Sequence, residues 1–389
     1  MPLKKPTFQL IESQAELDVF YKQNKEVRWL SFDTEFVGEK RFVTRLCLLQ
    51  IATQHGNYLI DPFQISDLSP VLELIQKEHI LKITHAGDND YRLLNNLYGI
   101  IPKNLFDTQI AAGFVGYKYP VSFRKLVESE LRIYLDKGYA VTDWESRPFL
   151  DKQLNYALED VLPLYALWQS LEGHLNRHQR LHWAREEFER MESPDFYYKD
   201  PNQEALSSDL IKSLNTKEQI FLIRLMDWRR RVASEKNYSK EMILPGKLLS
   251  HLVRSISSGQ DALRRNRRLP EKLIRQHGDF FEQLYRQPAT PEEQRLLSLL
   301  PSEESEDPFE EILLETLYLL VKYKCFEHGI PPGMVIARNA IKKIRSNGVS
   351  LEGWRKELLG EGLVERILNF DKLDMKVSES DIALVLVEE

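Results

Sequence analysis

The feature that most constrains the fold of this chain is a change in its hydrophobic pattern about halfway along. In the first half, short segments rich in β-branched, aromatic or leucine residues alternate with segments of helical periodicity. This alternation predicts strands and helices in turn. From about Leu206 onward, helical periodicity dominates to near the end. The chain has 389 residues, more than a single core usually holds, so we expect several domains.

The order of the predicted strands indicates the type of sheet. A meander of strands joined by a tight turn comes first, and later strands alternate with helices, which predicts a mixed sheet flanked by helices. Proline-containing linkers follow at 191–202 and 287–291. They predict an α/β domain at 1–200 and two all-helical domains at 205–288 and 292–389. The expected strands are 27–36, 45–53, 57–61, 81–85 and 105–106, and the expected helices are 72–77, 91–97, 122–130 and 151–171.

The charge of the middle segment differs from that of the rest of the chain. The net charge is −6, but residues 205–290 hold 17 basic and 9 acidic residues, a net charge of +8. A basic module joined to an acidic one is typical of a protein that binds a polyanion. Alternatively, the arginines of this segment lie on solvent-exposed helix faces and bind no polyanion. The candidate phosphate contacts are Arg229, Arg230 and Arg231, and then Arg264, Arg265, Arg267 and Arg268.

Two carboxylates stand one residue apart after an apolar stretch. Asp33 and Glu35 lie on the same side if that stretch is a strand, because alternate side chains share a face. Adjacent carboxylates repel each other. A divalent cation, a basic partner such as Arg28 or Arg45, or a shared proton would offset this repulsion. The first of these would make the pair half of a Mg²⁺ or Mn²⁺ site.

Further acidic residues occur at two other predicted element ends. Asp88 and Asp90 follow the strand predicted at 81–85, where Asp88 is well placed to cap a helix. Tyr156 and Asp160 lie one helical turn apart and therefore share a helix face. Each position taken singly also has a structural interpretation. Together they form one pattern of four carboxylates and a phenol.

That pattern resembles the ribonuclease D family of 3′→5′ exonucleases. The matching motifs are Asp-x-Glu from Asp33, His-Ala-x-x-x-Asp from His85 and Tyr-x-x-x-Asp from Tyr156. The second motif selects Asp90 rather than Asp88. The basic module resembles the helicase-and-ribonuclease-D C-terminal (HRDC) domain, with a weaker match beyond it. The resemblance implies a ribonuclease-H-like α/β exonuclease domain followed by two all-α HRDC-like domains.

The resemblance also implies the cofactors and the roles of the site residues. Two divalent cations, Mg²⁺ or Mn²⁺, would be held by Asp33, Glu35, Asp90 and Asp160, with Asp33 bridging both. Tyr156 would orient the attacking water. The candidate substrate-binding residues are His85, Gln50, Trp144 and Arg147, together with Arg264, Arg265, Arg267 and Arg268.

The resemblance implies a metal-dependent 3′→5′ exoribonuclease that releases nucleoside 5′-monophosphates. Its expected partners are tRNA precursors and other structured RNA 3′ ends. A DNA repair exonuclease and a catalytically silent RNA-binding protein are the alternatives. No nucleotide-triphosphate loop is present, which argues against a helicase.

Composition bears on where such a chain acts. Cys47 and Cys325 lie far apart, which indicates a reducing compartment without a disulfide framework. No apolar run is long enough to span a bilayer, so we expect no membrane partner. We therefore expect a cytoplasmic protein. We also expect a monomer, because no coiled-coil repeat is visible.

Overall fold

The protein forms two compact units in its computed structural model. The model describes residues 7–135, 142–300, 308–337, 340, 351–361, 373–377 and 382–386. The first unit contains Met1–Phe36, Leu46–Tyr197 and Glu306–Glu389, and the second contains Val37–Arg45 and Tyr198–Ser305. No helix in the described part of the chain is long and apolar enough to cross a membrane.

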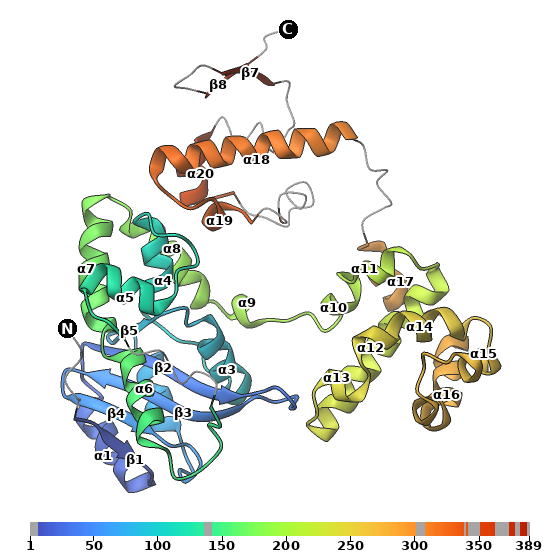
Figure 1. Ribbon diagram of the computed structural model, residues 1–389, viewed down its shortest axis with the longest axis horizontal. Helices are drawn as coiled ribbons and strands as arrows, with labels where there is room; N and C mark the ends of the chain where they lie inside the picture. The colour runs from blue at the N-terminus through green and yellow to red at the C-terminus, as the bar shows by residue number, and fades with distance from the viewer. Residues whose placement is uncertain are drawn as a thin grey trace. The chain divides into compact units, whose positions relative to one another are not determined.

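A six-stranded sheet forms the centre of the first unit (Figure 1), in the order β1-β4-β3-β2-β5-β6. Strand β4 pairs parallel to β1 and antiparallel to β3, whereas β5 pairs parallel to β2 and β6. The predicted mixed sheet is therefore confirmed, although the short first strand was not predicted. The strands are β1 (Gln9–Ile11), β2 (Trp29–Val37), β3 (Arg45–Thr53), β4 (Gly56–Ile60), β5 (Leu81–Thr84) and β6 (Leu105–Asp107).

Helices cover both faces of this sheet. On one face, Phe20 packs against Tyr58 and Phe32 stacks on Tyr91, which fixes α1 and α3 there. On the other face, Ala52 and Ile83 form a buried cluster with side chains of α6 and α7. The helices are α1 (Gln14–Asn24), α2 (Ser69–Gln76), α3 (Asp88–Tyr98), α4 (Thr108–Phe114), α5 (Phe123–Leu131), α6 (Asp151–Val161), α7 (Leu164–Arg177) and α8 (Leu181–Met191).

The single helix expected at 151–171 is two helices. Helix α6 ends at Val161, and Pro163 occupies the N-cap position of α7. Proline has no backbone N–H and clashes with the preceding turn of a continuous helix, so the break falls there. As a result, α6, which carries Tyr156 and Asp160, is a short helix separate from α7.

The C-terminal helices share the core of the first unit. Trp354 is 1% exposed, and its ring lies 4.8 Å from that of Phe114 and 6.1 Å from that of Trp183. A second HRDC-like domain at 292–389 remains a prediction, and the antiparallel hairpin β7–β8 was not predicted. These elements are α18 (Pro308–His328), α19 (Pro332–Val335), α20 (Trp354–Leu359), β7 (Leu373–Val377) and β8 (Ile382–Leu386).

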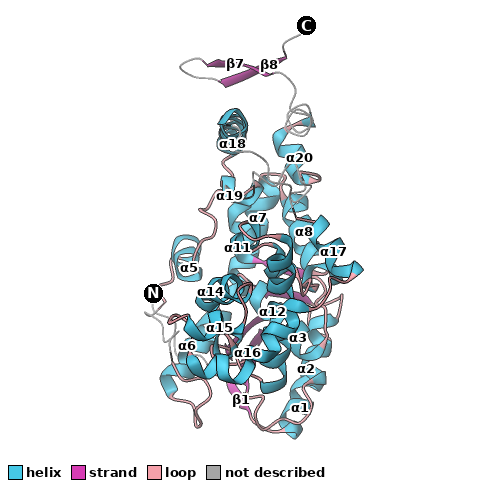
Figure 2. Cartoon of the chain, turned by 90° about the vertical axis from the view of Figure 1, so that its right-hand side faces the viewer, coloured by secondary structure: helices cyan, strands magenta, loops and turns pink. Residues whose placement is uncertain are grey.

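From Gln203 to Ser298, the described elements of the second unit are all helices, drawn in cyan in Figure 2, as predicted. Phe221, Leu252 and Phe281 are fully buried and belong to its core. The longest helix, α12, begins with a capping box at Asn215 and ends at Asn237 in the left-handed conformation. The helices are α10 (Gln203–Leu206), α11 (Asp209–Lys212), α12 (Thr216–Lys236), α13 (Lys240–Ile243), α14 (Gly246–Ile256), α15 (Gln260–Arg265), α16 (Glu271–Arg286) and α17 (Pro291–Ser298), with α9 (Pro194–Tyr197) closing the first unit.

One predicted arginine cluster of this unit is structural. Arg229 is 3% exposed, forms ion pairs with Glu204 and Glu241, and donates to the Lys240 carbonyl. Arg230 and Arg231 both pair with Asp227. The expectation that these three arginines contact phosphate is therefore wrong for Arg229, because its guanidinium is enclosed by protein.

Candidate active site

The end of β2 supplies two carboxylates to the face of the sheet covered by α6. Trp29 packs against the cluster that contains Val161 of α6, and side chains alternate along a strand. Asp33 and Glu35 therefore leave β2 on the same side as Trp29. Both are half-buried.

Asp90 is the third carboxylate, and it lies in the first turn of α3. It is 7% exposed, and its Oδ1 accepts a hydrogen bond from the hydroxyl of Thr34, which stands between Asp33 and Glu35. Asp88 does not cap the helix as expected, because Gly87 occupies the N-cap position and Asp88 pairs with Arg92 at the surface. The structure thus brings Asp90, and not Asp88, to the end of β2.

Sequence reasoning missed a buried aspartate that fixes the start of α3. Asp107 ends β6 and is 1% exposed. Its Oδ2 accepts the Gly87 backbone N–H at 2.8 Å, and its Oδ1 accepts the N–H groups of Gln109 and Ile110. An aspartate directly after a strand and before a helix is a capping signal that could have identified it.

Helix α6 contributes the fourth carboxylate and the phenol. Tyr156 and Asp160 lie one turn apart, and burial and then the charge of Asp160 raise the pKa of the phenol. The Tyr156 ring lies 6.3 Å from the ring of Trp144, centroid to centroid. The five residues expected at the catalytic site therefore come from β2, α3 and α6. We refer to Asp33, Glu35, Asp90 and Asp160 as the carboxylate cluster.

The members of the carboxylate cluster hold their protons more tightly than isolated carboxyls do. Burial, and then the charges of Asp90, Asp160 and Glu35, raise the pKa of Asp33 well above its usual range. Burial and the same kind of repulsion raise the pKa of Glu35 to about 9. Burial is also the main cause that raises the pKa values of Asp90 and Asp160 to about 7 each. This is the electrostatic state that a bound cation would relieve.

The donor set suits a hard divalent cation. Carboxylate oxygens are the ligands that Mg²⁺ and Mn²⁺ prefer in proteins. Within the described ranges, no group of three or more His, Cys, Asp or Glu side chains forms a ready-made metal site. The chemistry of the carboxylate cluster nevertheless fits a hard cation.

Of the predicted substrate contacts, Gln50 and Trp144 are buried and His85 is half-buried. His85 bonds through Nε2 to the Val121 carbonyl at 3.1 Å and through Nδ1 to the Thr108 hydroxyl at 3.0 Å. Trp144 is 3% exposed. Gln50 is fully buried on β3, and its side-chain amide has no hydrogen-bond partner among the described residues. These positions favour a supporting role for each of the three side chains. Direct contact of each with a substrate remains a prediction.

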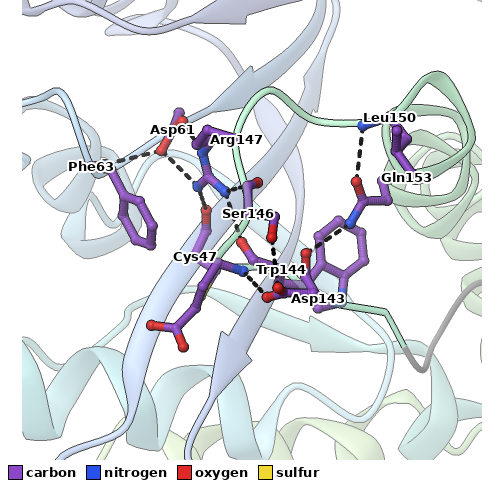
Figure 3. A network of polar contacts seen from close by, with 10 residues as sticks. Cys47, Asp61, Phe63, Asp143, Trp144, Ser146, Arg147, Leu150 and Gln153 are labelled. Atoms are coloured by element: carbon purple, nitrogen blue, oxygen red, sulfur yellow. Dashed lines mark hydrogen bonds and ion pairs between the residues drawn. The ribbon is translucent and has the colours of Figure 1, made fainter.

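Arg147, the fourth predicted contact, is enclosed by acceptors of the protein itself (Figure 3). It binds both carboxylate oxygens of Asp61, at 2.5 and 2.9 Å. It also donates to the carbonyl oxygens of Cys47, Trp144 and Ser146, at 2.8, 2.8 and 2.9 Å. The predicted contact with RNA would have to compete with these bonds.

The remaining predicted contacts lie on the surface of the second unit. Four arginines at the end of α15 and in the loop after it are all exposed. Their guanidinium groups take part in no ion pair among the described residues, unlike those of Arg230 and Arg231. Such cations are available to a polyanion. They are Arg264, Arg265, Arg267 and Arg268.

Known proteins are similar to this chain in both its α/β part and its helical part. A 3′–5′ exonuclease family matches residues 8–176, and the HRDC domain family matches residues 221–285. Ribonuclease D of Bartonella henselae is 30% identical over 363 residues, which cover 90% of this chain and 88% of that protein. Ribonuclease D of Zymomonas mobilis is 30% identical over 400 residues, which cover 97% and 98% respectively.

A solved structure extends the similarity to the fold of almost the whole chain. The crystal structure of Escherichia coli RNase D, described as an exoribonuclease involved in structured RNA processing, superposes with a TM-score of 0.82 at 26% identity. The match covers 94% of this chain and 99% of that one. Both the α/β part and the helical part of the chain therefore have a counterpart.

Proposed function

The chain belongs to the ribonuclease D family and is a 3′→5′ exoribonuclease, and on this premise we propose that it hydrolyses RNA with two divalent cations. The carboxylate cluster would hold them. The observation that carries the proposal is the placement of four carboxylates on β2, α3 and α6 close enough together that burial and their charges raise the pKa of Asp33. A group of this kind gains stability when cations replace its protons. Bound cations would stabilise charge on the attacking and leaving oxygens.

Each residue of the site has a definite part in this proposal. Asp33, Glu35, Asp90 and Asp160 would together hold the two cations. Thr34 orients the Asp90 carboxylate through the hydrogen bond from its hydroxyl. Outer-shell hydrogen bonds of this kind fix the rotamer of a ligating carboxylate.

Tyr156 would orient the attacking water and would not remove its proton. Burial, and then the negative charge of Asp160, raise the pKa of the Tyr156 phenol above its ordinary value of 10. The phenol therefore stays protonated at neutral pH and acts as a hydrogen-bond donor, because a general base must be deprotonated to accept a proton. Asp160 lies one turn later on the same helix and would hold a cation beside the phenol.

We infer that the substrates are tRNA precursors and other structured RNAs with unpaired 3′ ends, and that the products are nucleoside 5′-monophosphates. The inference is supported by the description of the E. coli relative as an enzyme of structured RNA processing. Attack of water on the terminal phosphodiester leaves the phosphate on the released nucleotide. The HRDC-like unit would bind RNA upstream of the trimmed end.

A direct test compares a 5′-labelled RNA carrying extra 3′ residues with a DNA of the same sequence. We expect stepwise shortening of the RNA with Mg²⁺ or Mn²⁺ and release of nucleoside 5′-monophosphates. Equal rates on RNA and DNA would support the DNA repair alternative instead. Binding of RNA without shortening under any metal condition would support the silent RNA-binding alternative.

Replacing the four exposed arginines Arg264, Arg265, Arg267 and Arg268 with Ala should weaken RNA binding and reduce its salt dependence. Each lost phosphate contact on single-stranded RNA removes about 0.7 from the slope of log K against log salt, so four lost contacts remove about 3. Fluorescence anisotropy of labelled RNA between 50 and 200 mM salt measures the change. The matched control is Arg230→Ala with Arg231→Ala, whose side chains already pair with Asp227. A salt slope that is equal in the quadruple variant and the wild type would place the RNA-binding surface elsewhere.

A further inference from the structure

The segment that leads into α6 is tied to the sheet by one arginine. Arg147 lies three residues before Leu150, the N-cap residue of α6. Its partner Asp61 directly follows β4 and is 1% exposed, and a further acceptor, the Cys47 carbonyl, belongs to β3. The segment before the helix is therefore joined to two strands of the sheet through a single side chain.

The guanidinium of Arg147 has no N–H left for another partner. Its five N–H groups make the five hydrogen bonds to Asp61, Cys47, Trp144 and Ser146 described above. The rings of Phe63 and Phe149 lie 4.2 and 3.7 Å from its central carbon and close the site further. We call Arg147, Asp61 and the three carbonyl acceptors the Arg147 network.

The Arg147 network reaches the catalytic helix by two routes. The first is Trp144, whose carbonyl is bound by Arg147 and whose buried ring lies against the ring of Tyr156. The second is Gln153 in the first turn of α6, which accepts the Leu150 N–H at 2.9 Å and donates to the Asp143 carbonyl at 3.0 Å (Figure 3). Both routes act on the same short helix, which ends ten residues after Asp151 because Pro163 begins the next one.

We propose that Arg147 is a positioning residue for the reaction, and that it sets the placement of Tyr156 and Asp160 by anchoring the segment before α6 to β3 and β4. It acts through Trp144 and Gln153 and does not bind RNA. The inference rests on the proposed function, because it concerns the helix that carries the water-orienting phenol and one proposed metal ligand. It differs from the expectation that Arg147 contacts the substrate.

Substitution of Arg147 can show whether this residue places the catalytic groups or only stabilises the fold. Arg147→Lys keeps the positive charge next to Asp61 but offers three donors on one nitrogen in place of a planar fork of five. We expect kcat to fall about tenfold to a hundredfold, because small misplacements of catalytic groups cost this much. KM and the RNA dissociation constant should stay within about threefold, as expected when only the transition state is affected.

A double substitution tests whether a fall in kcat comes only from unfolding of the protein. Arg147→Met with Asp61→Leu removes the buried ion pair without leaving an unpaired charge, a change that is often neutral for stability. We expect its thermal midpoint to stay within a few degrees of the wild type while kcat remains low, because the carbonyl groups of Trp144 and Ser146 lose their anchor. The matched control is Arg177→Lys, at the exposed end of α7, which should change neither kcat nor stability.

Hydrogen exchange of the full chain supplies a readout that does not depend on catalysis. We expect backbone amides of residues 150–160 to exchange at least about tenfold faster in both Arg147 variants, and unchanged in the control. Wild-type kcat and α6 protection in either folded variant would overturn the proposal. A raised KM at unchanged kcat would also overturn it, because that result identifies Arg147 as an RNA contact. If the wild type showed no metal-dependent activity, the proposed function would fail, and the exchange measurement would still test the network.

Discussion

Asp33→Asn is expected to reduce turnover by at least about a thousandfold while changing the dissociation constant for RNA less than threefold. Asp33 is a member of the carboxylate cluster that would hold both cations, so its loss removes the transition-state stabilisation that they supply. Binding is expected to survive because the exposed arginines of the second unit are proposed to bind RNA independently of the cations. Single-turnover degradation of labelled RNA and anisotropy binding in Ca²⁺ or without metal measure the two quantities.

The structure also predicts the direction in which Asp33→Asn changes the unfolding temperature of the metal-free protein. Asparagine carries no charge, so the substitution removes a carboxyl whose own pKa is raised by burial and by the charges of Asp90, Asp160 and Glu35. In EDTA at pH 8, the variant should therefore unfold at the same temperature as the wild type or a higher one. Asp88→Asn is the matched control, because Asp88 lies two residues from Asp90 but is exposed and paired with Arg92. A variant that lost RNA binding as strongly as turnover would contradict the separation of roles between the two units.

Removing divalent cations with EDTA is expected to abolish exonuclease activity, and excess Mg²⁺ or Mn²⁺ should restore it. The carboxylate cluster must lose its protons to bind a cation, and the pKa values of Asp90 and Asp160 are about 7 without one. Metal affinity should therefore rise between pH 6 and pH 8, by up to about tenfold per pH unit for each proton released. Titration calorimetry in buffers of different ionisation enthalpy counts those protons.

The sign of the stability change follows from the same carboxyls. Because their pKa values are higher in the folded protein than near 4 in the unfolded chain, the metal-free protein should lose stability as pH rises from about 5 to 9. Mg²⁺ should then raise the thermal midpoint more at pH 8 than at pH 6. Activity that persists in EDTA, or a Mg²⁺ effect that is larger at pH 6, would contradict the metal site.

The sequence predicted the positions of the site residues better than the roles of their neighbours. Asp33, Glu35, Tyr156 and Asp160 follow from local spacing, because a strand repeats every two residues and a helix every three or four. Whether a polar side chain is free for a ligand depends on distant partners. Arg147 is 86 residues from Asp61, so no local pattern shows that its donors are already used.

The fold shows the same division between local and distant information. Strands β2 to β5 and helix α3 were predicted because their hydrophobic periods are regular and Gly99 ends the helix in the left-handed conformation. The break at Pro163 was missed because helical periodicity continues across it on both sides. The incorporation of Trp354 in the first unit was missed because it depends on Phe114 and Trp183, which lie far away in the sequence.

The shared core of the first unit also orders events during synthesis of the chain. Trp183 donates from its indole to Glu357, 174 residues later, so this unit lacks part of its core until its last helices have been made. At about 5–20 residues per second, the ribosome needs roughly 10–30 s to pass from Tyr197 to Leu359. The remainder of the basic unit, Tyr198–Ser305, is translated in that interval. A nascent chain can therefore complete its basic unit before its nuclease core, which delays full nuclease capacity until translation of the chain is almost finished.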